Sequence, residues 1–328
     1  MKFGTVPLSG AEGAVLAHSL VADRRIPKGT VLTRAHLEVL SAAGFDTVTV
    51  ASLEDGDIDE NRAAARLADA VLKGVKGVRA TGAGAGRVNL YADHCGVVRI
   101  DSDTVHKINA VDPMITLATV SDHHRVDADG MIATIKIITY AVAEEALESA
   151  CSAAAAAVQL RKPIYKTATL IETTIGATLS DKGRRAMAGR VERMGMALTP
   201  RVLVPHEMEA LASSISQATG EVIFVLTASA TSDPLDVAPQ ALRKAGGVVE
   251  RFGMPVDPGN LLFLGRVGDR PVIGLPGCAR SPALNGADWV LERVICGLDV
   301  SHDDISAMGV GGLLKEIPTR PMPREKGV

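Results

Sequence analysis

The chain has 328 residues, 47% of them hydrophobic and 22% charged, which is typical of a globular protein of about two or three domains. Its net charge of −3 and its 3% content of aromatic residues argue against a basic or base-stacking surface for nucleic acid. No apolar run approaches the ~18 residues of a membrane span, and the stretch MKFGTVPLSGAEG lacks the apolar core of a signal peptide. We therefore expect a cytoplasmic protein.

The first half of the chain predicts two small domains rich in short strands. Residues 1–60 predict an α+β domain, with the turn IPKGTVLT, a short helix and the β-rich DTVTV. Residues 61–164 predict a β-rich domain that starts with a helix up to Leu72 and closes with a helix over 143–160. At the far end, residues 301–328 predict a tail or a linker because Gly, Pro and Arg recur there without periodicity.

Residues 165–300 predict a third domain in which apolar strands alternate with helices. Strands are expected at KTATLIETT (166–174) and EVIFVLT (221–227), and helices at 181–195, 206–218 and 237–247. This alternation indicates an α/β domain of three layers, with a mostly parallel sheet between helices. A two-residue hairpin through Gly268 and Asp269 is expected to add an antiparallel strand.

The stretch PVIGLPGCARSPALN (271–285) predicts a strand, a tight turn and a helix. Pro276 and Gly277 are turn residues, and Gly277 is expected to take a positive φ. Ser281 is expected to cap the helix, with Pro282 in its first turn. A helix that starts where a strand ends offers free N–H groups, so the turn is a candidate anion site. Most such junctions only connect elements, which is the alternative.

Ligands of parallel sheets bind at the carboxyl ends of the strands, which selects the loops 172–182, 227–236 and 276–281. Their hydroxyls and amides suit a polar heterocycle, and the basic start of the helix after the first loop suits a phosphate. Arg190 and Arg193 are expected on a solvated helix face, whereas function and solvation stay open for the two basic residues nearest the loop. Asp236 also fits a simple helix cap. The expected binding residues are Thr173, Thr174, Ser180, Lys182, Arg184, Thr227, Ser229, Thr231, Ser232, Pro276, Gly277 and Ser281, and the expected catalytic residues are Asp181, Asp233 and Asp236.

From Thr227 to Asn285 the chain resembles the pterin-binding domain of molybdenum-cofactor biosynthesis proteins. The motifs are the Ser-rich acidic loop 229–236, the Pro258-Gly259 pair, and the GLPG turn at 274–277 followed by Ser281. Upstream, RVNLYADHCGVV and GMIATIKII resemble a subgroup that can be fused to a MobA-like nucleotidyltransferase. The resemblance to MoeA-type molybdotransferases and MoaB/Mog-type adenylyltransferases implies a MoaB/Mog-like domain, molybdopterin as ligand, Mg²⁺ and ATP if it transfers groups, and a homo-oligomer.

The chain departs from this family where the chemistry is done. The first loop, TTIGATLSDKG, lacks the family's acidic pair and keeps only Asp181 nearby. The second has Ala228-Ser229 in place of Gly-Gly, and Asn260 stands where a lysine is expected. Three hypotheses follow: a molybdopterin-binding protein with transferase activity, a noncatalytic pterin carrier serving a separate nucleotidyltransferase, and a nucleotide-pyrophosphatase-like relative of the same fold.

Two other patterns predict no site. TGAGAGR (81–87) has neither the spacing nor the strand–loop–helix context of a dinucleotide loop. The stretches DHC (93–95) and SDHH (121–124) hold residue types that bind metals, but no fixed spacing joins them, so a polar hairpin surface is preferred. The cysteines Cys95, Cys151, Cys278 and Cys296 form no CxxC pair and fit reduced thiols; at Cys278 a buried filler is preferred to a reactive group.

Overall fold

A computed structural model describes residues 1–176 and 180–314; the parts of the first expected loop at 177–179 and of the expected tail at 315–328 lie outside them. The chain forms two compact units. One comprises Met1–His94 and Val98–Leu160, and the other comprises Cys95–Val97 and the chain from Arg161 onward. Within the described ranges, no helix is long and apolar enough to cross a membrane.

The first unit contains two separate hydrophobic cores. One packs around Leu16, Leu32 and Leu40, and the other around Leu67, Leu90 and further buried residues up to Val158. The finer domain boundaries predicted within this unit stay predictions. The elements around the smaller core are β1 (Lys2–Pro7), η1 (Leu8–Gly10), β2 (Val15–Leu16), β3 (Leu20–Val21), β4 (Arg25–Ile26), α1 (Arg34–Ala42) and β5 (Thr47–Ser52), with β1, β5 and β2 forming one antiparallel sheet.

The larger core lies against a four-stranded antiparallel sheet of order β10-β12-β8-β7. Its first helix begins after Asp59, whose carboxylate accepts two backbone N–H groups. The elements are β6 (Asp57–Asp59), α2 (Glu60–Leu72), β7 (Val78–Ala80), β8 (Arg87–Ala92), β9 (Gly96–Ile100), α3 (Ser102–Val111), β10 (Ile115–Thr119), β11 (Arg125–Val126), β12 (Met131–Ile137), β13 (Ala141–Ala143), α4 (Glu144–Ala153) and β14 (Val158–Arg161).

The helix expected over 143–160 is shorter than predicted. It ends at Ala153, and Ala156 takes a left-handed conformation with φ of 61°. Val158 then starts β14, which joins the sheet of β9 and β11. The alanine run has the propensity of a helix, but pairing with a sheet overrides propensity at its end.

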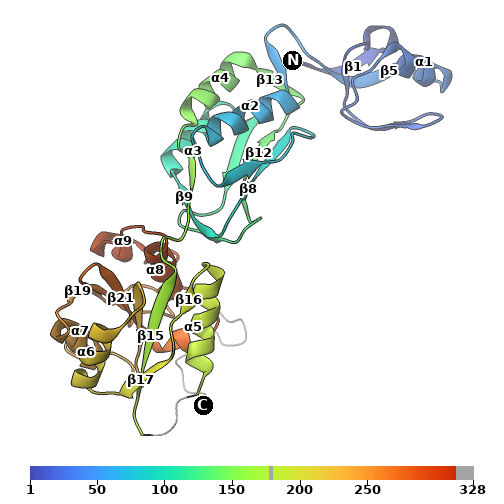
Figure 1. The fold of residues 1–328 in the computed structure, drawn as a ribbon. Helices are drawn as coiled ribbons and strands as arrows, with labels where there is room; N and C mark the ends of the chain where they lie inside the picture. The colour runs from blue at the N-terminus through green and yellow to red at the C-terminus, as the bar shows by residue number, and fades with distance from the viewer. Residues whose placement is uncertain (177–179, 315–328) are drawn as a thin grey trace, which may run out of the picture. The chain divides into compact units, whose positions relative to one another are not determined.

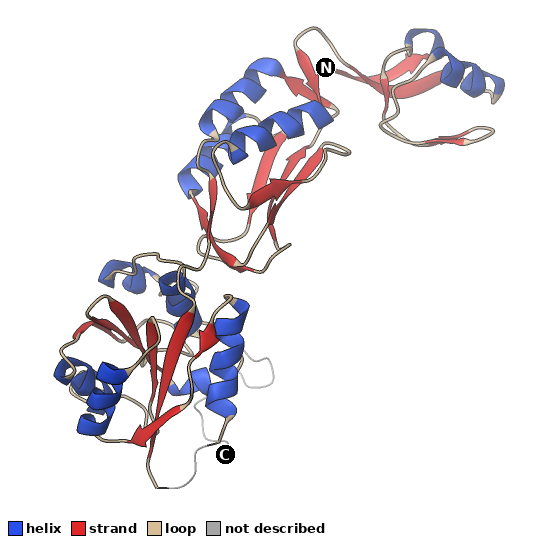
Figure 2. Ribbon diagram, in the orientation of Figure 1, coloured by secondary structure: helices blue, strands red, loops and turns tan. Residues whose placement is uncertain are grey.

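The second unit is a three-layer α/β/α domain, as predicted (Figures 1 and 2). Its seven-stranded sheet has the order β16-β15-β18-β21-β20-β19, with β17 also paired to β15. The elements are β15 (Thr167–Thr174), α5 (Lys182–Arg193), β16 (Ala197–Leu198), β17 (Val202–Pro205), α6 (Met208–Gln217), β18 (Val222–Leu226), α7 (Val237–Lys244), β19 (Val248–Phe252), β20 (Phe263–Val267), β21 (Arg270–Leu275), η2 (Gly277–Arg280), α8 (Gly286–Ile295) and α9 (His302–Ala307).

Period-two alternation divides the side chains of this sheet between two cores. On β18, Phe224 packs with α5 and α8, whereas Ile223 and Val225 pack with α6 and α7. Figure 1 shows α5 on one side of β15 and the pair α6 and α7 on the other. Strands buried on both faces read as continuous apolar runs, which is why the sequence pattern predicts this sheet well.

The sheet is parallel in its centre and antiparallel at one side. β15 pairs in parallel with β16, β17 and β18, and β18 pairs in parallel with β21. β20 runs antiparallel to both β19 and β21. The predicted hairpin through Gly268 and Asp269 is confirmed, because β20 ends at Val267 and β21 begins at Arg270.

Candidate functional site

The carboxyl ends of the parallel strands meet at one edge of the sheet. Register pairs Thr174 with Pro205, Glu172 with Leu226, and Leu226 with Leu275. The three loops that the sequence selected therefore leave the sheet at neighbouring points, as expected. We call this the ligand edge.

A buried carboxylate lies at the centre of the ligand edge. Glu172 has a side chain that is 0% exposed, and its Oε2 accepts a hydrogen bond from Nε of Arg201 at 2.9 Å. The Nη1 of the same arginine binds Asp181, and its Nη2 donates to the carbonyl of Ser180 at 3.4 Å. Within the described residues, Oε1 of Glu172 has no hydrogen-bond partner. Asp181, an expected catalytic residue, is thus ion-paired.

A second arginine approaches the same point from the third loop. Arg280 donates from Nη2 to the carbonyl of Thr227 at 2.7 Å, which ties this loop to the end of β18. A Cβ placed on Gly183 would lie 3.2 Å from Nη1 of Arg280 and 3.4 Å from Oε1 of Glu172. The glycine in the first turn of α5 therefore lets these two side chains come close together.

Two threonines of the predicted set are held by neighbouring segments. Thr173 Oγ1 accepts the N–H of Ala228 at 2.7 Å and lies 2.9 Å from Nδ1 of His206. Thr174 Oγ1 donates to the carbonyl of Val204 at 3.3 Å. Thr173 thus joins the first loop to the second, which fixes the spacing between them.

In the second loop the polar residues mostly support the loop itself. Asp236 caps α7 by accepting the N–H of Val237 at 2.7 Å, and it also accepts the N–H of Ser232 at 3.1 Å. Asp233 accepts the N–H of Leu235 at 2.7 Å. Thr227 and Thr231 are buried, with their hydroxyl oxygens 3.3 Å apart, whereas Ser229 is exposed. The capping alternative for Asp236 is confirmed.

The third loop differs from its prediction in two ways. After Pro276 the chain forms the short 3₁₀ helix η2, and α8 begins only at Gly286, with Asn285 in place of Ser281 as its cap. Gly277 is exposed, and it is absent from the positive-φ positions within the described residues. Asn285 caps α8 in preference to Ser281 because it forms a capping box with Asp288. The charge next to the turn therefore comes from Arg280, not from an α-helix start.

Three further residues of the set lie at the start of α5. Ser180 and Lys182 are exposed, and Arg184 is half-buried with Nη2 donating to the carbonyl of Thr199 at 2.8 Å. Arg193 is exposed, as expected. Arg190 corrects the prediction, because it is buried and ion-paired with Asp288 at 2.5 Å. Its partner lies 98 residues away in the chain, so helical periodicity cannot reveal it.

The sequence argument missed Glu172, Arg201 and His206 as members of the ligand edge. One signal was available: Glu172 is a charged residue inside an apolar strand, and such a residue is buried only with a partner. The partner could not be found by spacing alone. Arg201 lies before β17, whose pairing with β15 brings the two together.

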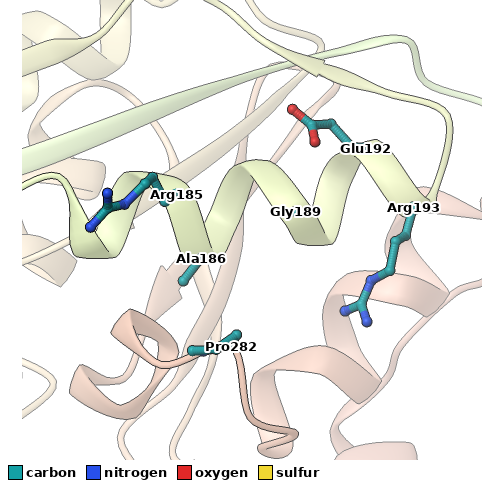
Figure 3. A pocket seen from close by; sticks show the side chains of 6 residues that line it. All are labelled: Arg185, Ala186, Gly189, Glu192, Arg193 and Pro282. Carbon is teal, nitrogen blue, oxygen red and sulfur yellow. The ribbon is translucent and has the colours of Figure 1, made fainter.

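A pocket of about 510 Å³ is lined by residues of α5 and by Pro282. Figure 3 shows Ala186 next to Pro282, with Arg185 and Arg193 toward the two ends of the helix. None of the predicted site residues lines this pocket. It is therefore distinct from the ligand edge.

Within the described residues, neither Cys278 nor the side chains of metal-binding type form a reactive arrangement. Burial raises the pKa of the Cys278 thiol, which favours the filler interpretation over a reactive thiolate. Within residues 1–176 and 180–314, no group of three or more His, Cys, Asp or Glu side chains is placed to hold a metal ion.

Known proteins give distant likenesses. A family model described as a domain of unknown function (DUF8806) matches residues 5–52, and the comparison with curated proteins gives no match. Among solved structures, the chain is similar to a molybdopterin biosynthesis MoeA protein from Pyrococcus horikosii, at 13% identity and a TM-score of 0.27, over 84% of this chain and 70% of that one.

Two other solved structures share this distant likeness. A molybdenum cofactor biosynthesis protein from Pyrococcus furiosus has 13% identity and a TM-score of 0.25, over 91% of this chain and 66% of that one. A structure described as MogA has 24% identity and a TM-score of 0.26, over 40% of this chain and 91% of that one. Identities and TM-scores this low do not define a function.

Proposed function

We propose that the ligand edge binds molybdopterin, a pterin that carries a phosphate, in molybdenum-cofactor biosynthesis. The observation that carries this proposal is the meeting of three loops where Arg201 and Arg280 surround the buried Glu172. The GLPG turn and the Ser-rich acidic loop, which resemble the pterin-binding family, leave the sheet at this edge.

The residues present fit such a ligand. Guanidinium groups make charge-assisted hydrogen bonds to phosphate, and Arg280 lies at the turn where the phosphate is proposed to bind. Threonine hydroxyls and loop amides suit the donors and acceptors of a pterin ring. The bound group would supply its own dithiolene chemistry; Arg280 would hold its phosphate, and Thr231 and Ser232 would orient its ring.

Between a transferase and a noncatalytic pterin carrier, the contacts of the carboxylates favour the carrier. Asp181 is paired with Arg201, and Asp233 and Asp236 are occupied by N–H groups of their own loop. A molybdotransferase or adenylyltransferase would need such carboxylates for Mg²⁺ and ATP, so Asp181 would first have to leave Arg201. In the carrier role, the partner would be a separate nucleotidyltransferase. The predicted homo-oligomer can be tested by light scattering.

Calorimetric titration with molybdopterin under anaerobic conditions tests the binding proposal. We expect saturable heat at micromolar protein, and an affinity at least about tenfold weaker in Arg280→Met, since a hydrogen bond to a charged group is lost. Arg266→Met is the matched control, because this exposed arginine lies on β20 and binds Glu250. No heat with the wild type would overturn the proposal.

Activity assays on the purified chain separate the alternatives. Turnover that depends on both ATP and molybdate would exclude the carrier role. Hydrolysis of dinucleotides without pterin binding would instead favour the pyrophosphatase-like hypothesis.

A further inference from the structure

Arg190 holds a stretch of backbone next to the ligand edge. Its side chain is 3% exposed, and its Nη1 donates to the carbonyls of Ala186 at 3.2 Å and Ala279 at 3.0 Å. Its Nη2 donates to the carbonyls of Ser281 at 2.8 Å and Ala283 at 3.1 Å. Three of these four carbonyls belong to the segment 279–283, which joins β21 to α8.

Asp288 completes the arrangement from the first turn of α8. Its side chain is 4% exposed, and its Oδ1 accepts from Nε of Arg190 at 2.5 Å. Its Oδ2 accepts the N–H of Asn285 at 2.8 Å, which caps the helix. One buried ion pair thus ties α5, the segment 279–283 and α8 together.

The held carbonyls lie on both sides of Arg280. Ala279 precedes it and Ser281 follows it, and both carbonyls point at the Arg190 guanidinium. In a trans peptide the carbonyl and the next N–H point in opposite directions. Anchoring the Ala279 carbonyl therefore turns the N–H of Arg280 away from the core and fixes where its side chain begins.

We propose that Arg190 and Asp288 are positioning residues that set Arg280 for the anionic group of the ligand. This inference rests on the proposed function, in which Arg280 binds a phosphate. A buried ion pair stabilises a fold little compared with apolar residues of similar size, so a role in conformational specificity gives it a reason to be there. A guanidinium also supplies five donors in one plane, which a lysine cannot do.

The test separates positioning from stability. Arg190→Met alone leaves the Asp288 charge buried without its cation and is expected to unfold readily. The double variant R190M/D288N removes both charges and keeps an oxygen for the Asn285 N–H, so we expect it to fold. Arg193→Met is the matched control, because it removes an exposed arginine from the same helix.

Two readouts are taken on the double variant. Without ligand, hydrogen–deuterium exchange over 277–284 should become at least about tenfold faster, while exchange over 183–189 in α5 stays at the wild-type rate. With molybdopterin, the dissociation constant should rise about tenfold, as for loss of one charge-assisted hydrogen bond. Arg193→Met should change neither.

The two proposals fail separately. If the wild type binds no molybdopterin but exchange over 277–284 rises in the double variant, positioning stands and the proposed ligand falls. If the folded double variant exchanges at the wild-type rate over 277–284, the positioning role is overturned, whatever its affinity for molybdopterin.

Discussion

Glu172 and Arg201 form an ion pair in which the carboxylate is 0% exposed and the guanidinium 25% exposed, with Nε and Oε2 2.9 Å apart. The charge in the core of the ligand edge is thus balanced by a cation that water can reach. Because a buried carboxylate without a partner is strongly unfavourable, the ion pair with Arg201 contributes to the stability of this edge.

Arg201→Met should lower the free energy of unfolding by about 3 kcal/mol, since it breaks the ion pair of the buried Glu172. The double variant E172Q/R201M should recover most of this loss, because no buried charge remains. Urea unfolding measures both. Lys244→Met, which breaks the exposed pair with Glu209, should cost no more than about 1 kcal/mol. Equal losses in Arg201→Met and Lys244→Met would show that Glu172 is not effectively desolvated.

Gly183→Ala should destabilise the domain by about 1–3 kcal/mol, since its Cβ would lie 2.8 Å from Cδ2 of Leu226 and crowd Arg280. Gly189→Ala on the same helix is the control. Nothing lies within 4 Å of its added Cβ, so we expect stabilisation by about 0.5–1 kcal/mol. Thermal unfolding of both variants measures the difference. A Gly183→Ala protein as stable as Gly189→Ala would contradict the close approach of Leu226 and Arg280 to Gly183.

Gly277→Ala should leave the free energy of unfolding within about 0.5 kcal/mol of wild type, because the residue is exposed and its added Cβ meets nothing within 4 Å. If the turn lines the ligand site, its affinity for molybdopterin should still fall. Gly268→Ala is the control and should lower the free energy of unfolding, because a φ of 57° disfavours a side chain. It should leave the affinity for molybdopterin unchanged, because Gly268 lies in the hairpin before β21, at the start of that strand. Unchanged affinity in Gly277→Ala would make the turn only a connection.

Burial raises the pKa of the Cys296 thiol to about 12, from a usual value of 9.0. Between these two values the unfolded thiol loses its proton while the folded thiol keeps it, so stability is lost as pH rises. The slope is at most about 1.4 kcal/mol per pH unit. Urea unfolding at pH 8, 9 and 10 should therefore show a shallower decline in Cys296→Ala than in wild type. Parallel declines would show that this thiol ionises alike in both states.

The sequence predicted the second unit better than the first because its signals are local. Apolar runs such as Val222–Leu226 and the Gly268-Asp269 turn carry their structure within a few residues. Helix starts were predicted well where a single cap decides them, as Asp236 does for α7. At α8 two caps compete, and Asn285 prevails over Ser281 through its reciprocal bonds with Asp288.

The candidate site was predicted only in part, because its core depends on contacts between distant segments. The three loops leave the sheet at one edge, as predicted, since the carboxyl ends of parallel strands meet there. Arg190 was placed in solvent because three other arginines share its helix, and only Asp288, far along the chain, explains its burial. Arg201 escaped notice for the same reason, because its partner Glu172 lies 29 residues earlier in the chain, on a different strand.

The central strand β18 sends every side chain into one of two cores, so it has no position to spare for recognition. Substitutions on this strand therefore disturb packing, whereas exposed positions of the loop beyond Leu226, such as Ser229, can change with less effect on the fold. Variants with altered ligand specificity should therefore carry their substitutions in the loops and not in β18.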